Sequence, residues 1–387
     1  MRDEGPFRSF FQAGFECASH RRRDGRRLDL IASTGHDRFC EQDYQAVAAH
    51  GLRSARDGFR WHLIERSPGR YDWSSVLPII RAARRNGVQV TWDLCHFGWP
   101  DDVDIWSAAF VERFAAFAAA AARVLVAETG EPPILCPINE ISFFAWGGGD
   151  VAAINPATRG RGQELKRQLV RAAIAAIDAV RAVAPASRFI SAEPAIHIHS
   201  YSRSAAVRAA AEAYRLAQYE ALDMLIGRVA PDLGGRDDHV DMVGLNFYPR
   251  NQWLHRGSTL PLGHHGYRPF SEMLQEAHER YGRPLLVAET GAEGSARAAW
   301  LHYVGDEVRV AMDAGVPVLG ICLYPVIDYP GWDDDRLCLT GLFGPADGEG
   351  RRAVHKPLAE ELARQAFLHA GSPPGANGFT ARASTSG

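Results

Sequence analysis

The chain of 387 residues has little of several features that would mark a particular class of protein. Lysine occurs only at Lys166 and Lys356, and the formal net charge is −3, so no basic stripe predicts a nucleic-acid partner. The apolar runs are too short to span a membrane, and the charged N-terminus has no stretch typical of a signal peptide. We therefore expect a cytoplasmic protein that has neither a nucleic acid nor a membrane as its partner.

Signatures of bound cofactors are missing as well. The six cysteines show no CxxC spacing, and four of them lie in or at the end of apolar runs, so buried reduced thiols are expected. No GxGxxG or GxxxxGK[ST] pattern follows an early strand, and the Gly147–Gly149 run lacks the lysine of a phosphate-binding loop. We interpret that run as a flexible rim of a cleft, and the sequence predicts no cofactor.

What the chain does contain is an alternation of short apolar runs with long helical patterns, which is typical of a β/α protein. The predicted strands are Phe10–Phe15, Leu52–Phe59, Val88–Cys95, Ile134–Ile138, Arg188–Ala192, His239–Phe247, Pro284–Ala288 and Val318–Tyr324. The predicted helices are Gln42–His50, Ser75–Asn86, Ala108–Val126, Gln163–Val183, Ala205–Ile226, Phe270–Tyr281, Ala296–Ala314 and Leu358–His369.

Eight strand-then-helix units are the number that a (β/α)8 TIM barrel requires, and parallel strands buried on both faces read as unbroken apolar runs. A doubly wound sheet is the competing α/β architecture, but it would need the missing glycine-rich turn. We predict a single barrel over residues 1–370. The remaining 371–387 have the composition of a disordered tail.

In such a barrel the functional side chains follow the carboxyl ends of the strands. The residues of interest there are Arg56, His96, Asn139, Glu140, Glu193, Asn246, Tyr248, Glu289, Tyr324, Asp328 and Trp332. Glu140 and Glu289 end the fourth and seventh strands, so they should face each other across the barrel. A retaining glycosidase uses two carboxyl groups about 5 to 5.5 Å apart, one as nucleophile and the other as acid and then base. The pair therefore predicts glycosidase chemistry.

Several segments are similar to those of the clan A glycoside hydrolases, most closely family 1, the β-glucosidase and β-galactosidase group. CPINEI resembles the family's T-x-N-E-P segment, and LLVAETGAEG resembles its I-T-E-N-G segment. HGLRSARDGFRW, CHFGWP, GLNFYP and LYPVIDYPGW resemble further segments in the same order along the chain. The resemblance runs from about Phe10 to Phe343 and implies the same barrel fold.

The resemblance also implies roles for five residues. Glu289 would be the nucleophile and Glu140 the acid/base, whose pKa we expect to be raised. Asn139 would contact the sugar 2-hydroxyl, Arg56 would lie beside the nucleophile, and Tyr248 would donate a hydrogen bond to it.

Further sugar contacts are predicted at other strand ends. The resemblance implies His96, Tyr324, Asp328 and Trp332, and position in the barrel adds Glu193 and Asn246. The chain departs from the family where a glutamine that grips the glycone falls on or near His20 and Arg21, and where a second glycone residue, a glutamate, falls on Gly331. Arg21 beside the glycone hints at an acidic or otherwise unusual sugar.

Alternatives stay open at this level. His197 and His199 with Glu193 are zinc-ligand types, but no well-spaced third ligand follows, so we predict no metal. The expected partner is a small glycoside or an oligosaccharide. A transglycosylase that uses the same site, or a sugar-binding barrel that has lost catalysis, would leave the same pattern, and the sequence does not reveal the oligomeric state.

Overall fold

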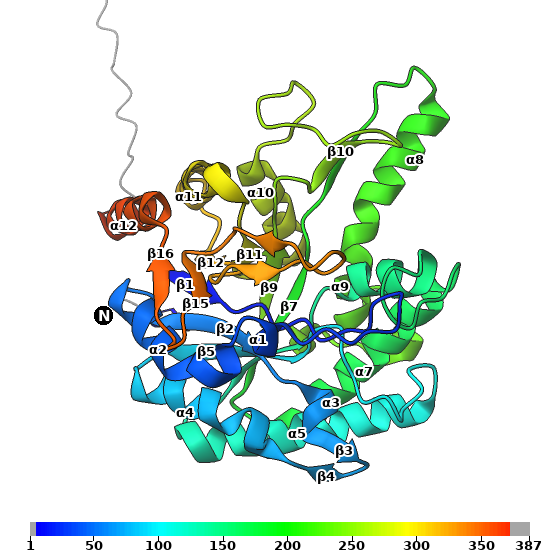
Figure 1. The fold of residues 1–387 in the computed structure, drawn as a ribbon. Coiled ribbons are helices and arrows are strands. Elements are labelled where there is room, and N and C mark those ends of the chain that lie inside the picture. The colour runs from blue at the N-terminus through cyan, green and yellow to red at the C-terminus, as the bar shows by residue number, and fades with distance from the viewer. Residues whose placement is uncertain (1–4, 372–387) are drawn as a thin grey trace, which may run out of the picture.

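The computed structural model describes residues 5–371, which fold around a closed barrel of eight parallel strands (Figure 1). The strand order around the barrel is β1-β12-β11-β9-β7-β6-β5-β2. These strands are β1 (Phe11–Gly14), β2 (Ser54–Gly58), β5 (Gln89–Cys95), β6 (Ile134–Ile138), β7 (Arg188–Pro194), β9 (Met242–Asn246), β11 (Leu285–Thr290) and β12 (Val318–Leu323). Each overlaps one predicted apolar run, and the (β/α)8 barrel is confirmed.

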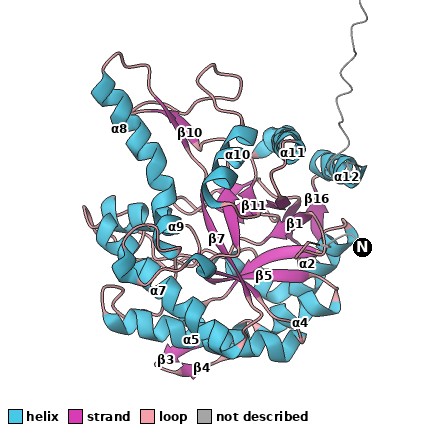
Figure 2. Ribbon diagram, turned by 180° about the vertical axis from the view of Figure 1, so that it is seen from behind, coloured by secondary structure: helices cyan, strands magenta, loops and turns pink. Residues whose placement is uncertain are grey.

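Helices surround the barrel on the outside (Figure 2). The longer ones are α2 (His36–Ala49), α4 (Leu77–Arg85), α5 (Ala108–Thr129), α7 (Gly162–Val183), α8 (Ala205–Leu216), α10 (Phe270–Tyr281), α11 (Arg297–Asp313) and α12 (Lys356–Gly371). Local sequence sets their ends: at α5, the Ser107 hydroxyl accepts a hydrogen bond from the Phe110 amide, and Gly130 ends the helix with a φ of 74°. A hydroxyl cap and a left-handed glycine satisfy backbone groups that the helix leaves unpaired.

The core has two parts, because the strands bury both of their faces. The smaller part fills the barrel interior with Ile134, Cys136, Ile190, Ala192, Met242, Leu286 and Ala288. The larger part lies between the strands and the helix ring and contains most of the buried aromatic side chains. Apolar side chains thus pack the barrel interior, and its strand ends are left for polar groups.

One predicted helix is broken in the structure. The continuous helix expected over Ala205–Ile226 divides into α8, a short 3-10 turn at Ala217–Tyr219, and α9 (Glu220–Leu225). Gln218 in the turn accepts a hydrogen bond from the amide of Ile196 and donates one to its carbonyl. Helix α8 and the small parallel pair β8 (His197–His199) and β10 (Gln252–Leu254) project from one side of the barrel (Figure 1).

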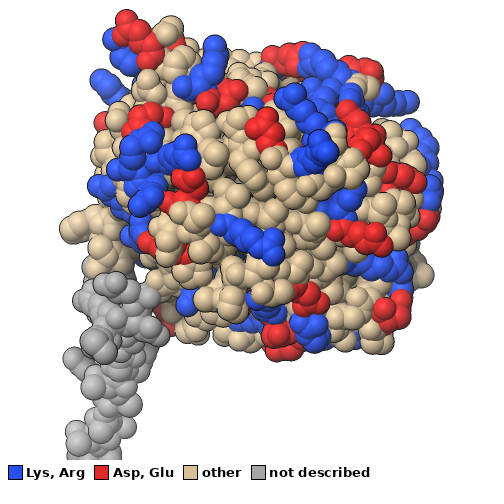
Figure 3. Space-filling model, turned by 90° about the horizontal axis from the view of Figure 1, so that it is seen from below, with Lys and Arg blue, Asp and Glu red and all other residues tan. Residues whose placement is uncertain are grey.

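The surface shows no segregation of charge on the face seen in Figure 3, where basic and acidic side chains are intermixed. Among residues 5–371, no helix combines the length and the apolar character needed to cross a bilayer. Gly371 is the last residue of α12, and the rest of the predicted tail, 372–387, lies outside the described residues.

Candidate active site

A cavity of about 1080 Å³ opens at the carboxyl ends of the barrel strands. It is lined by residues at the ends of seven of the eight strands together with side chains from the surrounding loops. Those at the barrel mouth are Glu16, His96, Asn139, Glu140, Tyr248, Glu289, Tyr324 and Trp332. Seven of these eight are sequence predictions, and Glu16 is the addition.

Arg56 organises the floor of this cavity. Its side chain is 2% exposed, and Nη1 donates to Oε1 of Glu289 at 2.8 Å. Nη2 donates to Oδ1 of Asn139 at 2.7 Å, and Nε and Nη2 bind the two oxygens of Asp93 at 2.9 and 2.8 Å. The planar guanidinium therefore fixes three groups that come from three different strands.

Both oxygens of Glu289 are held. Oε1 accepts from Arg56, and Oε2 accepts from the hydroxyl of Tyr248 at 2.8 Å. Glu289 is 5% exposed, so these charge-assisted hydrogen bonds lie away from bulk water. A carboxylate held in one orientation beside a cavity is suited to attack a bound carbon atom.

Glu140 is held in another way. Its backbone has φ 44° and ψ 61°, in the left-handed region, where a residue with a Cβ is strained by about 1–2 kcal/mol. Its amide donates to the carbonyl of Ala192 at 2.9 Å, and its Oε1 accepts from Nδ2 of Asn246 at 2.9 Å. Burial, and then the charge of Glu289, raise the pKa of Glu140 well above its usual range. A carboxyl that keeps its proton is able to act as a general acid.

His96 is bound through both ring nitrogens. Asn139 Nδ2 donates to its Nε2 at 3.1 Å, so Nδ1 carries the proton and donates to Asp93 at 2.8 Å. Asp93 thus joins His96 to Arg56, although sequence reasoning passed over it. A carboxylate inside the apolar run VTWDLC was the signal that could have revealed it.

One cluster near His96 has the side chains of a metal site. Single ligand atoms of Cys17, Asp93 and His96 lie within 4.8 Å of one another. However, both Asp93 oxygens are bound by Arg56, and the His96 Nδ1 proton points at Asp93. A cation here would lie beside the guanidinium, so the three side chains fit a hydrogen-bond network better than a metal ion.

Several solved structures share this fold. A β-glucosidase from Thermotoga maritima in complex with glucoimidazole has a TM-score of 0.77 at 16% identity, with 92% of this chain and 98% of that chain covered. The family 1 β-glucosidase from the same organism has a TM-score of 0.74 at 15% identity, also with 92% and 98% covered. The chain has the fold of the family 1 β-glucosidases. The AHE enzyme from Alicyclobacillus herbarius is similar as well, with a TM-score of 0.75 at 16% identity over 92% of this chain and 98% of that chain. No protein-family model and no curated protein matches the sequence.

On this β-glucosidase fold, two predicted sugar contacts lie behind the cavity lining. Asn246 binds Glu140, as described, and is fully buried. Glu193 accepts a hydrogen bond from the Ser142 amide at 3.0 Å and so caps the short helix α6 (Ile141–Phe144) that follows Glu140. Burial raises the pKa of Glu193 to about 7. Both residues support Glu140 and do not face the cavity.

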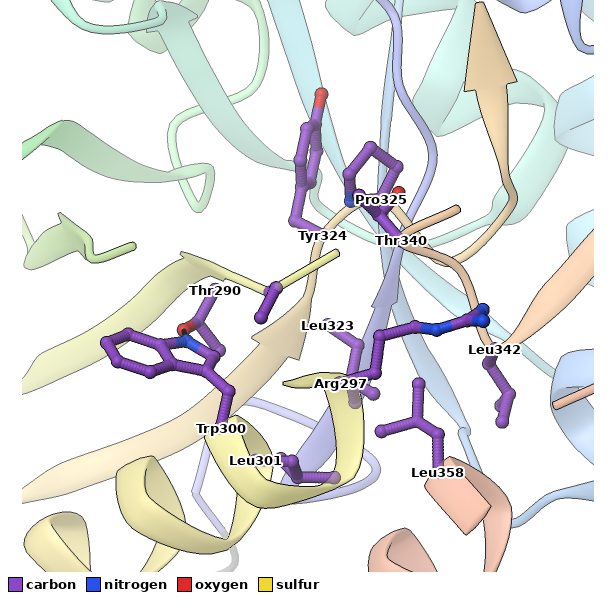
Figure 4. Close-up of a pocket in the computed structure, with 12 residues that line it drawn as sticks. Thr290, Arg297, Trp300, Leu301, Leu323, Tyr324, Pro325, Thr340, Leu342 and Leu358 are labelled. Carbon is purple, nitrogen blue, oxygen red and sulfur yellow. Dashed lines mark hydrogen bonds between the residues drawn. The ribbon is translucent and has the colours of Figure 1, made fainter. Parts of the chain in front are cut away.

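Two other predicted contacts are engaged elsewhere, which corrects their assignment. Arg21 donates to both oxygens of Asp101, at 2.8 and 2.5 Å, and lies half-exposed outside the cavity lining. Asp328 accepts from the Gly341 amide at 2.7 Å and lies 3.6 Å from Arg297. Arg297 borders a separate cavity of about 20 Å³, from which the ring of Tyr324 points away (Figure 4). Each side chain is thus already bound by a partner from another part of the chain.

The rim of the cavity contains the glycine run Gly147–Gly149 and the residues beside it. Gly147–Gly149 lie in a π-helical segment, Ala145–Asp150, and the chain packs closely there: a Cβ on Gly148 would be 2.7 Å from the Asn155 carbonyl oxygen. The structure therefore explains these glycines by close packing of the chain, whereas we had expected them to make the rim flexible. Trp146 beside them lines the outer part of the cavity, together with Tyr214 of α8 and Trp253 of β10.

The two histidines of β8 lie on the part of the chain that projects from the barrel with α8 and β10. The rings of His197 and His199 are 6.2 Å apart between centroids, and among the described residues they form no group of three metal-ligating side chains. Glu193, which could have completed such a group, is bound to Ser142.

Proposed function

We propose that the protein is a retaining β-glycosidase. Glu289 attacks the anomeric carbon while Glu140 donates its proton to the leaving oxygen, which forms a glycosyl ester and releases the aglycone. Glu140 then removes a proton from water, the water oxygen attacks the anomeric carbon, and the ester bond to Glu289 breaks. Each step conserves charge between the two carboxyl groups.

The observation that carries the proposal is the contrast between the two carboxyl groups. Glu289 accepts hydrogen bonds from the Arg56 guanidinium and the Tyr248 hydroxyl, whereas burial and the charge of Glu289 raise the pKa of Glu140. Two carboxyl groups in unlike environments are the arrangement that separates a nucleophile from a proton donor. The β-glucosidase fold of the structural neighbours supports the same reading.

The other site residues take supporting roles in this proposal. Asn139 keeps one amide hydrogen free of the network and would meet the sugar 2-hydroxyl, a contact that strengthens in the oxocarbenium-like transition state. Tyr324 and Trp332 line the cavity and offer aromatic surface to the sugar. A volume of about 1080 Å³ suits a glycoside with a large aglycone or an oligosaccharide.

The decisive experiment substitutes the nucleophile. Glu289→Ala should abolish hydrolysis of an aryl β-glycoside, and azide should restore part of the release of the aryl group by forming a glycosyl azide. A 2-fluoro glycoside should label Glu289 in the native protein. Full hydrolysis by the variant would disprove the assignment, and absence of the label in an active enzyme would favour inversion.

The two alternatives have distinct outcomes in the same assays. A transglycosylase forms the labelled intermediate but transfers the sugar to an added acceptor more readily than to water. A sugar-binding barrel binds the glycoside and forms no intermediate. The intact contacts of Glu289 with Arg56 and Tyr248 argue against loss of catalysis.

A further inference from the structure

A third carboxyl group faces the cavity from the first barrel strand. Glu16 follows β1 by two residues, is 6% exposed and belongs to the cavity lining. One of its oxygens, Oε1, accepts a hydrogen bond from the Ala18 amide at 3.0 Å, which orients the side chain. Within residues 5–371 no arginine, lysine or histidine lies at ion-pair distance from it.

The two basic side chains that act on the Glu16 carboxyl group are already engaged. These are Arg56 and His96, and Glu289 acts on the same carboxyl group as a like charge. Arg56 is bound to Asp93, Glu289 and Asn139, and the two nitrogens of His96 are bound to Asp93 and Asn139. Neither of these two side chains is free to pair with an acidic group on a bound sugar.

The same cavity also offers an unused hydrogen-bond donor. Trp332 Nε1 is buried and has no partner in the described part of the chain, and its ring packs on His20 at 4.7 Å between centroids. A sugar hydroxyl both donates and accepts, so the hydroxyls of a neutral sugar can donate to a carboxyl oxygen and accept from an indole N–H. A sugar carboxylate only accepts and would meet Glu16 as a like charge.

We propose that Glu16 is a specificity-determining residue of the glycone site and selects an uncharged sugar over a uronic acid. The proposal rests on the glycosidase function proposed above and names its substrate class. It replaces the acidic sugar that the position of Arg21 suggested, because that guanidinium is bound to Asp101 outside the cavity lining. Burial raises the pKa of Glu16, and in its neutral form the carboxyl still offers no positive charge to a uronate.

The test compares aryl β-glycosides that share one aglycone. The native protein should cleave at least one neutral glycoside, in the gluco, galacto, fuco or xylo series, with a kcat/KM at least tenfold above that for the glucuronide. Glu16→Ala should lower kcat/KM on the preferred neutral sugar by about 10- to 100-fold, the range for a hydrogen bond to a charged acceptor. Glu16→Gln keeps the shape and should narrow the neutral-to-uronide ratio.

The control is Glu279→Gln, which removes the same charge from an exposed position on α10 and should leave the ratio unchanged. Thermal unfolding checks that each variant is folded. A native preference for the glucuronide would overturn the proposal, and so would a Glu16→Ala variant that is folded and unaltered on every neutral sugar.

A ligand-binding measurement distinguishes failure of the proposed glycosidase function from failure of the proposed role of Glu16. If no glycoside is cleaved and no 2-fluoro sugar labels Glu289, the glycosidase assignment fails. Calorimetry with isofagomine lactam, an uncharged compound bound in a Thermotoga maritima β-glucosidase structure, then replaces the kinetic test. Weaker binding to Glu16→Ala than to the native protein would support the role of Glu16. Equal binding to both, or none to the native protein, would overturn it.

Discussion

The substitution Asp93→Asn tests whether the network beneath the cavity positions the reacting groups. Asp93 is fully buried, accepts two hydrogen bonds from Arg56 at 2.9 and 2.8 Å, and accepts one from His96 at 2.8 Å. Asparagine has the same shape, but it removes the charge and presents an NH2 group to donors. Arg56 would then lack one of its two anionic partners.

The expected cost follows from burial. Removing one member of a buried ion pair costs about 3–5 kcal/mol, because the other charge is left uncompensated, and a typical domain has only about 5–15 kcal/mol of total stability. The matched control is Asp101→Asn, which breaks the pairs with Arg21 and Arg27 at a carboxylate that is 56% exposed. Exposed pairs contribute about 1 kcal/mol or less. Urea unfolding should separate the two variants by at least 2 kcal/mol by these ranges.

Activity should change together with stability. Glu289 and Asn139 are both oriented by Arg56, and a displacement of about 1 Å in a reacting group can lower the rate about 100-fold. We expect kcat on an aryl β-glycoside to fall by about that factor in Asp93→Asn and to stay within twofold in Asp101→Asn. Equal unfolding free energies for the two variants, with unchanged kcat in both, would refute the positioning role of Asp93.

Three further predictions concern single groups around the two carboxyls. Activity should fall as pH rises through the raised pKa of Glu140, which gives the pH–rate profile an alkaline limb. In Glu140→Gln, tested with a leaving group that needs no protonation, this limb should vanish. An unchanged limb would show that another group causes the fall in activity. Tyr248→Phe removes the 2.8 Å hydrogen bond to Glu289 and should lower kcat/KM by about 10- to 100-fold, and an effect under twofold in steady-state kinetics would contradict this. Burial raises the pKa of Glu193 from 4.5 to about 7, so the folded protein binds this proton more tightly than the unfolded chain, and stability should decline between those pH values by on the order of 3 kcal/mol. Glu193→Gln should remove that decline in urea unfolding, and native-like pH dependence in the variant would count against the burial argument.

Much of the fold could be predicted because it depends on local patterns. The unbroken apolar runs that form β6 and β11 mark strands buried on both faces, and the helical patterns between the runs mark the crossovers of parallel strands. The rule that strand ends carry function then selected Asn139, Glu140, Tyr248 and Glu289, all of which line one cavity.

Other residues were misjudged because their environment depends on partners remote in sequence. Arg21 is bound by Asp101, Asp328 lies between Gly341 and Arg297, and neither pairing leaves a trace in local sequence. Glu193 stands at a strand end as predicted, but the short helix after Glu140 covers it.

The sequence by itself determined the barrel and the order of the polar residues around its mouth, because periodicity and strand ends are local properties of the chain. Only the tertiary structure decided the surroundings of the carboxyl groups that the strand-end rule did not select, Asp93 and Glu16. Asp93 is enclosed by Arg56 and His96, whereas Glu16 forms no ion pair among residues 5–371. That difference arises from side chains of neighbouring strands and loops that meet when the barrel closes.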